Sequence, residues 1–188
     1  MPYIDEAMMD VLRSKAKAAD GSPSRDSSPS VFDRIVRLVA SRERCTSELR
    51  SRMIREGYLP DDVDAAIRRS VECGLVDDVR FADVLIRTRL GQGRGRRGIE
   101  DELKRLGIAL SDVCGWPESY FGEQASAETE RALDVLRRHP PKSKNVLQSA
   151  YRKLVSKGFE PSVASAASRT YWKTVSCSGD GDGGEPII

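Results

Sequence analysis

Three glycines near the middle of the chain, Gly93, Gly95 and Gly98, form the pattern GxGxxG. In some proteins this pattern holds the pyrophosphate of a dinucleotide at the N-terminus of a helix that follows a β-strand. Here the preceding residues have the apolar spacing of an amphipathic helix, and three acids at 100–102 would repel a phosphate. No GKS or GKT ending follows, so the sequence supports neither nucleotide binding nor nucleotide hydrolysis.

Residue types that perform catalysis are sparse. His139 is the single histidine, and no Ser, Cys or His cluster has the spacing of a known catalytic family. The four cysteines stand far apart without a CxxC pair, which argues against a zinc site or a disulfide framework. They are Cys45, Cys73, Cys114 and Cys177. We therefore expect a protein that holds no cofactor or metal and is not an enzyme.

Charge is distributed unevenly along the chain. The net charge is only +2, although 32% of the 188 residues are charged. Seven arginines against two acids stand in residues 34–55, seven acids against two arginines in 56–78, and six arginines against one acid in 79–97. Residues 142–173 carry seven Lys or Arg against one acid. Solvated helix faces explain any one cluster, whereas the repeated basic excess favours a polyanionic partner.

The densest group of cations forms the candidate binding site. Guanidinium groups suit phosphates and carboxylates, and a glycine-rich backbone allows close approach to another chain. The alternative interpretation is a solvated loop, outside the core, whose arginines have no partner. In the helix expected after the glycines, Glu100 and Asp101 stand three to four residues before Lys104 and Arg105 and can form ion pairs with them. The candidates are Arg87 and Arg89, then Arg94, Arg96 and Arg97 in the expected flexible glycine loop, then Lys104 and Arg105.

Residues 31–173 have apolar spacings of three and four residues without sustained alternation, which predicts helices and no strand. The paired acids at 61–62 and 77–78 stand at helix starts, where capping is worth about 0.5 to 2 kcal/mol. Val71 is expected to face the core. The nine expected helices lie at about 31–40, 46–56, 60–73, 77–90, from Ile99 to Gly107, near Ser111, and at 127–138, 143–157 and 162–173.

The second helix of each group of three ends in a glycine followed by an apolar residue. The glycines are Gly57, Gly107 and Gly158, at spacings of 50 and 51 residues, and Met53, Leu103 and Leu154 stand four positions earlier. This spacing indicates an internal repeat. Such a unit cannot bury its apolar face alone, and stacking on its neighbours supplies the missing core. We predict an all-α fold of three tandem three-helix repeats in an elongated, curved array.

The expected repeats cover residues 31–78, 79–122 and 123–175. Residues 1–30 form an N-terminal extension, in which we expect a short helix at 3–19. Residues 20–30 and the tail at 176–188 have little to bury, so we expect a flexible linker and a disordered tail. No apolar run approaches the ~18 residues of a membrane span, and the N-terminus lacks the order of a signal peptide. We expect a cytoplasmic protein.

The stretch GLVDDVRFADVLIRTRLGQGRGRRGIEDELKRLGI at 74–108 resembles the central signature of the RecX family. In that signature an aspartate-capped helix with Phe-Ala leads into a glycine-rich turn and a helix ending Leu-x-x-x-Gly-Ile. SELRSRMIREGY at 47–58 fits the same family, and with the third unit the resemblance covers about 31–173. Cys45 stands where this family usually has a capping serine, which leaves Thr46 as the candidate cap.

The resemblance implies a regulator of the recombinase RecA, acting in recombination, DNA repair and the SOS response. Such a protein is a monomer that binds the RecA nucleoprotein filament on single-stranded DNA, with the DNA itself as a further contact. It inhibits filament growth, strand exchange and the coprotease function. Two alternatives stay open. One is a helical DNA-binding protein whose arginines contact phosphates without RecA, and the other is a scaffold that uses its helices only for protein contacts.

Overall fold

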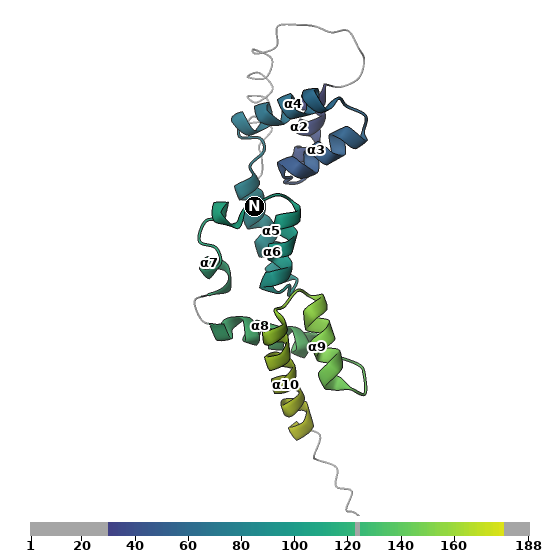
Figure 1. Ribbon diagram of the computed structural model, residues 1–188, viewed down its shortest axis with the longest axis vertical. Helices are drawn as coiled ribbons and strands as arrows, with labels where there is room; N and C mark the ends of the chain where they lie inside the picture. The colour runs from purple at the N-terminus through teal and green to yellow at the C-terminus, as the bar shows by residue number, and fades with distance from the viewer. Residues whose placement is uncertain (1–29, 123–124, 179–188) are drawn as a thin grey trace, which may run out of the picture. The chain divides into compact units, whose positions relative to one another are not determined.

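The computed structural model describes residues 30–122 and 125–178, and every regular element in these ranges is helical (Figure 1). The elements are α2 (Val31–Ser41), α3 (Thr46–Arg55), α4 (Pro60–Glu72), α5 (Asp78–Gly91), α6 (Arg96–Arg105), the 3-10 turn η1 (Leu110–Asp112), α7 (Glu118–Phe121), α8 (Ala125–Arg138), α9 (Val146–Ser156) and α10 (Pro161–Ser178). The prediction of helices without strands is confirmed for these residues. The expected helix at 3–19 and most of the linker and tail lie outside the described residues.

Three local expectations are wrong. The helix expected near Ser111 is a single 3-10 turn, followed by the four-residue helix α7. The last helix, α10, continues to Ser178 and so includes the first three residues of the expected tail. Val71 is 47% exposed, and the neighbouring Ser70 is buried with its hydroxyl donating to the Ala66 carbonyl oxygen at 2.8 Å.

The described residues divide into two compact units, with the boundary between Phe81 and Ala82, inside α5. In the first unit α2, α3 and α4 enclose one core (Figure 1). Ser30 begins α2 as expected, because its Oγ accepts from the amide of Asp33 at 3.1 Å and donates to the Asp33 carboxylate at 2.8 Å. The core residues are Ile35, Leu38, Val39, Leu49, Met53, Val63, Ala66, Ile67, Leu75 and Val76.

The N-terminus of α3 is capped from α5. Cys45 occupies the N-cap position of α3 without a capping hydrogen bond from its side chain. Instead the carboxylate of Asp78, the first residue of α5, accepts from the Thr46 amide at 2.8 Å and from the Thr46 hydroxyl at 2.6 Å. Thr46 therefore donates and does not cap, and Asp77 caps α5 by accepting from the amides of residues 79 and 80.

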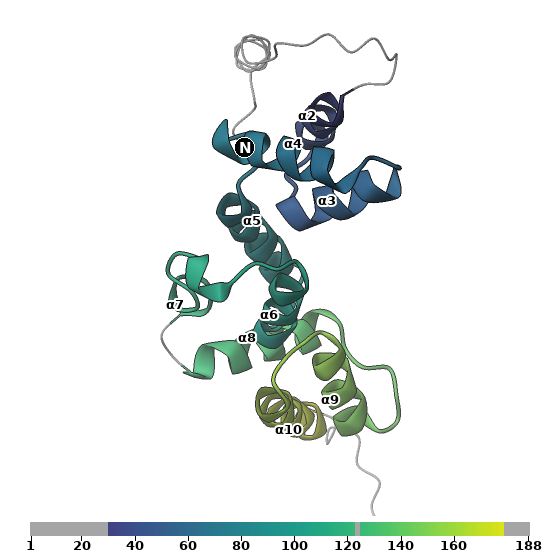
Figure 2. The ribbon, with the colours of Figure 1, turned by 45° about the horizontal axis from the view of Figure 1, so that its top comes forward.

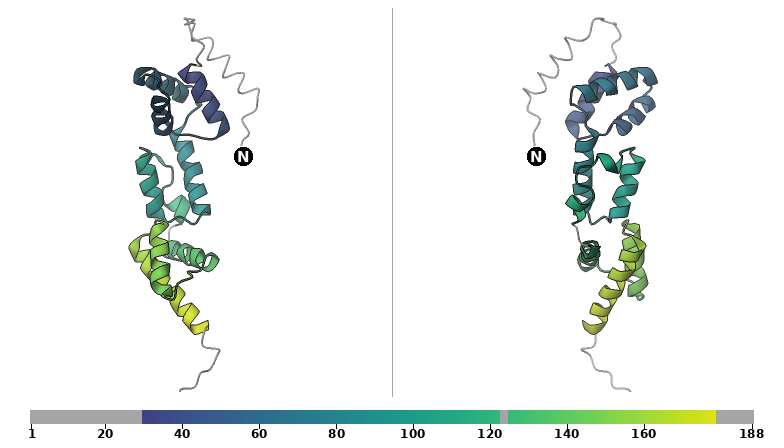
Figure 3. Two further views of the ribbon diagram at one scale, coloured as in Figure 1. Left: turned by 90° about the vertical axis from the view of Figure 1, so that its right-hand side faces the viewer. Right: turned by 60° about the vertical axis from the view of Figure 1, so that its left-hand side comes forward.

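The second unit holds the remaining helices. α5 and α6 lie side by side in both views of Figure 3. α10 packs on α8 and α9 around a separate core (Figure 2). That core consists of Ala132, Leu133, Val135, Leu136, Ala150, Leu154, Phe159, Ala164 and Ala167. The limits expected between repeats, including the one at residue 122, stay a prediction.

The three repeat glycines end equivalent helices, as predicted. α3, α6 and α9 each stop before a glycine in the left-handed region, with φ of +96° at Gly57, +74° at Gly107 and +83° at Gly158. The apolar residue after each glycine then donates its amide to the carbonyl oxygen five positions earlier, at 3.0 to 3.2 Å. The acceptors are the backbone carbonyls of Met53, Leu103 and Leu154. The side chains of these three residues are fully buried, which explains why an apolar residue stands at that position in every repeat. In the ranges that the structure describes, no helix is long and apolar enough to cross a membrane.

Candidate functional site

The glycine-rich segment between α5 and α6 is a packed turn. The amide of Gly95 donates to the carbonyl oxygen of Lys157 at 3.0 Å. The amide of Gly98, in the first turn of α6, donates to the carbonyl oxygen of Gly158 at 2.9 Å. A Cβ on Gly95 would lie 2.5 Å from that oxygen, and one on Gly98 would lie 2.9 Å from the Gly158 Cα. Neither position has room for a side chain.

The expectation of a flexible loop that carries three arginines is wrong in two respects. α6 begins at Arg96, so Arg96 and Arg97 belong to its first turn and only Arg94 precedes the helix. The turn is also held against the end of α9 by two backbone hydrogen bonds. The close backbone approach that the glycines allow is therefore made within the chain itself.

The N-terminus of α6 receives its hydrogen-bond acceptor from α8. Gly95 is the N-cap residue and has no side chain, and Oε1 of Glu128 accepts from the amide of Arg96 at 2.8 Å. A carboxylate is stabilised at this positive end of the helix dipole. A phosphate at the same place would have to displace Glu128, so the GxGxxG pattern serves backbone packing in this fold.

Arg87, the first of the seven candidate cations, is tied to an acid on its own helix. Its Nε lies 2.9 Å from an oxygen of Asp83, and the Tyr120 hydroxyl donates to the same carboxylate at 2.8 Å. These hydrogen bonds, that of Arg87 foremost, hold the pKa of Asp83 below its usual value. The Arg87 guanidinium also lies 5.6 Å from the centre of the Tyr120 ring.

Arg89 and Arg96 are tied in the same way. Arg89 makes a two-pronged contact with Glu102, with Nη2 at 2.5 Å and Nε at 2.8 Å from the two carboxylate oxygens. This contact joins α5 to α6, lowers the pKa of Glu102 and raises that of Arg89. Nε of Arg96 bonds to Glu100 at 2.8 Å. Arg89 and Arg96 therefore stabilise the fold around the turn.

Four candidate cations form no ion pair with an acid of the described residues. Arg97 and Lys104 are exposed and stand seven positions apart on α6, which places them on one face of the helix. The side chain of Arg94, three positions before Arg97, is also exposed. Nε of Arg105 donates to the backbone carbonyl of Asp101 at 3.2 Å. A role for these cations in binding stays a prediction.

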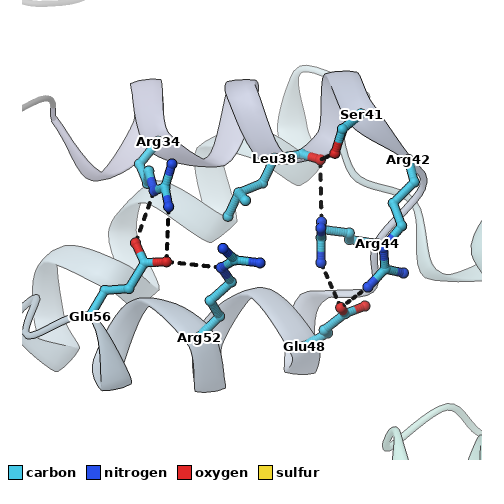
Figure 4. A network of polar contacts seen from close by, with 8 residues as sticks. All are labelled: Arg34, Leu38, Ser41, Arg42, Arg44, Glu48, Arg52 and Glu56. Atoms are coloured by element: carbon cyan, nitrogen blue, oxygen red, sulfur yellow. Dashed lines mark hydrogen bonds and ion pairs between the residues drawn. The ribbon is translucent and has the colours of Figure 1, made fainter.

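Most of the arginines of residues 34–55 form ion pairs, several of which are drawn in Figure 4. Glu56 accepts from Arg34 at 2.9 and 3.1 Å and from Arg52 at 2.9 Å. The hydrogen bonds from Arg34 and then Arg52 lower the pKa of Glu56 to about 2. Arg50 is paired with Asp64 at 2.7 Å. This stretch therefore fits the interpretation of a solvated, ion-paired helix surface.

A second acid in Figure 4, Glu48, holds two more arginines. It pairs with Arg42 and, at 2.6 Å, with Nη1 of Arg44. Arg44 is buried and also donates Nε to the carbonyl oxygen of Leu38 at 3.2 Å. Charged side chains from this network line a cleft of about 490 Å³, together with Arg55. The two glutamates already occupy most of the guanidinium groups that an anion would need.

The last repeat has a basic surface that the candidate list did not include. None of the seven Lys or Arg of residues 142–173 forms an ion pair with an acid of the described residues, and Glu160 is the single acid within that stretch. Lys153 and Lys157 bond only to backbone carbonyls, those of His139 and Gln92. The seven-to-one excess in the sequence was the available signal. The other cations of this surface are Lys142, Lys144, Arg152, Arg169 and Lys173.

Fold and surface together define an all-helical repeat protein with exposed, unpaired cations. Residues 77–113 match the family model described as RecX, second three-helix domain. A regulatory protein RecX of Xanthomonas citri is 31% identical over 140 residues, which cover 72% of this chain and 84% of that protein. The chain belongs to the RecX family.

Further relatives carry the same name. The regulatory protein RecX of Mycolicibacterium vanbaalenii is 36% identical over 104 residues, which cover 54% of each chain. That of Halorhodospira halophila is 36% identical over 107 residues, covering 55% of this chain and 66% of the relative. The aligned region thus spans between half and two thirds of these two relatives. Their name describes regulators.

Two solved structures have a similar fold. The crystal structure of RecX from Lactobacillus salivarius aligns with a TM-score of 0.57 and 15% identity over 76% of this chain and 95% of that one. A second crystal structure of a regulatory protein RecX aligns with a TM-score of 0.59 and 18% identity over 88% of this chain and 79% of that one. At these identities the likeness concerns the fold alone.

Proposed function

We propose that this chain binds the RecA filament on single-stranded DNA and limits its growth, strand exchange and coprotease activity. The observation that carries the proposal is the 31% identity to a regulatory protein RecX across 84% of that relative's length. The proposal makes the chain a cytoplasmic monomer that regulates by binding and catalyses no reaction.

The surface charges give the proposal a physical basis. Arg97 and Lys104 are exposed on one face of α6, and the last repeat has cations that no acid of the described residues neutralises. Exposed cations without acid partners attract a polyanion, because binding releases the counterions condensed on its phosphates. Arg87, Arg89 and Arg96 are less suited to this role, since each would first have to leave its acid.

DNA binding without RecA is the second candidate function, and the basic surface of the last repeat favours it. Phosphate contacts alone carry no preference for a protein-coated strand. A RecA regulator instead binds the assembled filament more tightly than either of its components. The two functions therefore differ in which form of the DNA the chain selects.

Co-sedimentation tests the choice directly. The full chain is mixed with RecA alone, with single-stranded DNA alone and with the RecA–DNA filament, at the same salt concentration. We expect binding to the filament to exceed binding to either component at least about tenfold, a difference of about 1.4 kcal/mol. Equal sedimentation with bare DNA and with the filament would favour the second function and contradict the first.

A further inference from the structure

A pocket of about 390 Å³ opens between α9 and α10, in the repeat that carries the unpaired cations. Tyr151, Leu147 and Gln148 line it from α9, and Ser168 and Arg169 from α10. This volume lies in the range of small-ligand sites, about 300 to 1,000 Å³. No acid contributes to the lining.

The hydroxyl of Ser168 is a buried polar group without a partner. Ser168 is 1% exposed, and its Oγ has no hydrogen bond to any described residue. Thr170 and Thr174 on the same helix behave differently, because each hydroxyl donates to the carbonyl oxygen four residues earlier. A buried hydroxyl is normally hydrogen-bonded, so Ser168 is a site of imperfect polar packing beneath the pocket, and its shielded oxygen is out of reach of a ligand.

Tyr151 provides an aromatic surface at this pocket. It is 37% exposed, and Leu147, one turn earlier on α9, is 38% exposed. A ring that is packed on one side and open on the other can stack on a flat heterocycle. Stacking of this kind tolerates any base, because every base has a π-face.

The charges around the pocket specify an anionic ligand chain. Arg169 lines the pocket, and Arg152 follows Tyr151 on α9. Neither residue has an ion-pair partner in the part of the chain that the structure describes. An apolar peptide side chain or an uncharged heterocycle would make no use of the arginines. A nucleotide within a single strand offers a flat base to the tyrosine and a phosphate to the arginines.

We propose that this pocket holds one nucleobase of single-stranded DNA. Tyr151 stacks on the base, and Arg169 contacts the adjoining phosphate. The inference rests on the proposed function for the presence of single-stranded DNA. It adds that the chain contacts bases as well as phosphates.

The test separates base contacts from phosphate contacts. Fluorescence anisotropy measures the affinity of the full chain for a labelled oligothymidylate and for an oligomer of equal length with abasic tetrahydrofuran sugars. Both carry the same phosphates. We expect the oligothymidylate to bind roughly 5- to 100-fold more tightly, the effect of one stacked base. Equal affinities, or no binding of either oligomer, would overturn the proposal.

Variants assign the difference to the pocket. Tyr151→Ala should lower the oligothymidylate affinity to that of the abasic oligomer and leave the abasic affinity unchanged, whereas Tyr151→Phe keeps the ring and should bind like the native chain. Val155→Ala, at another exposed apolar residue of α9, is the matched control. Circular dichroism of each variant checks that the helices remain. An equal loss for both oligomers in Tyr151→Ala would contradict stacking.

These measurements contain no RecA, so they can fail while filament co-sedimentation succeeds. In that case the proposed function stands and the pocket does not hold a base. If Tyr151→Ala weakens filament binding and leaves oligothymidylate affinity unchanged, the occupant is a protein side chain and the nucleobase assignment is wrong. Base-dependent binding without any preference for the filament would instead retain the pocket and remove the proposed function.

Discussion

Gly98 and Gly158 meet backbone to backbone, with the amide of Gly98 donating to the carbonyl oxygen of Gly158 at 2.9 Å. A Cβ on Gly158 would lie 2.4 Å from the Cα of Gly98, closer than any side chain tolerates. The contact joins the first turn of α6 to the end of α9. Gly98 belongs to the GxGxxG pattern and Gly158 to the repeat pattern, so the two sequence patterns meet in one packing contact.

Replacement of the repeat glycines by alanine should therefore lower the free energy of unfolding by unequal amounts. Gly107→Ala meets only the strain of a positive φ, about 1 to 2 kcal/mol, because no atom lies within 4 Å of its Cβ position. Gly158→Ala adds the overlap with Gly98, for a total of about 2 to 5 kcal/mol. Urea unfolding of the two variants measures the difference. Equal losses would contradict the tight contact.

The carboxylate of Asp78 should stabilise α3 from outside that helix. Asp78→Ala removes the acceptor of the Thr46 amide and hydroxyl, and we expect it to cost about 0.5 to 2 kcal/mol of unfolding free energy. Asp101→Ala is the matched control, since Asp101 is an exposed acid inside α6 that stands beyond the first turn and forms no ion pair with a described residue. The prediction is wrong if both alanine variants unfold at the same urea concentration.

The ion pairs of Glu56 should make stability depend on pH in the acid range. The pKa of Glu56 is about 2 in the folded chain, below its ordinary value of 4.5, so its carboxylate stabilises the fold fully above the ordinary value. That contribution is lost as the pH falls toward about 2. Glu56→Gln should accordingly be less stable than the native chain near neutral pH, and the gap should close in acid.

Urea unfolding at a series of pH values measures this gap. Glu72→Gln is the control, because Glu72 is exposed on α4 and forms no ion pair with a described residue. We expect its stability to follow that of the native chain at every pH. A constant deficit of Glu56→Gln from neutral to acid pH would mean that the ion pairs with Arg34 and Arg52 do not stabilise the fold.

Charge on the exposed face of α6 should govern filament binding. The double variant Arg97→Glu with Lys104→Glu should bind the filament more weakly, while Arg97→Lys with Lys104→Arg keeps the charge and should bind like the native chain. If phosphates are the partners, each lost contact lowers the slope of log affinity against log salt by ~0.7 to 0.9. Partners among RecA carboxylates would give a shallower dependence.

Melting curves of both double variants check that the fold is intact. Neither Arg97 nor Lys104 pairs with an acid of the described residues, so both variants should have the melting temperature of the native chain. Undiminished filament binding and inhibition by the Glu variant would identify this helix face as solvated surface.

Arg89→Gln should behave differently from the Arg97 and Lys104 variants, because Arg89 does pair with an acid. The substitution breaks the two-pronged contact with Glu102 and should lower the unfolding free energy by about 1.5 to 3 kcal/mol, as expected for a hydrogen-bonded charge.

The repeats were predictable from the sequence because the interactions that define them are local. A helix that ends at a left-handed glycine needs only that glycine, the next apolar residue and the carbonyl five positions before it, as at Gly57 with Met53. All of these residues stand within one turn and a half of chain. The GxGxxG pattern could likewise be separated from a phosphate site by the helix before it and the acids after it.

Tertiary structure decided which charges remain free. Residues 34–55 and 142–173 both read as basic in the sequence, yet Glu56 and Asp64 neutralise arginines of the first stretch and only Glu160 stands within the second. The same holds for the cap that Asp78 supplies to α3 and for the backbone contact of Gly95 with residues 157–158. Each of these contacts joins residues more than ten positions apart. Their geometry depends on how whole helices pack, which no local pattern of residue types specifies.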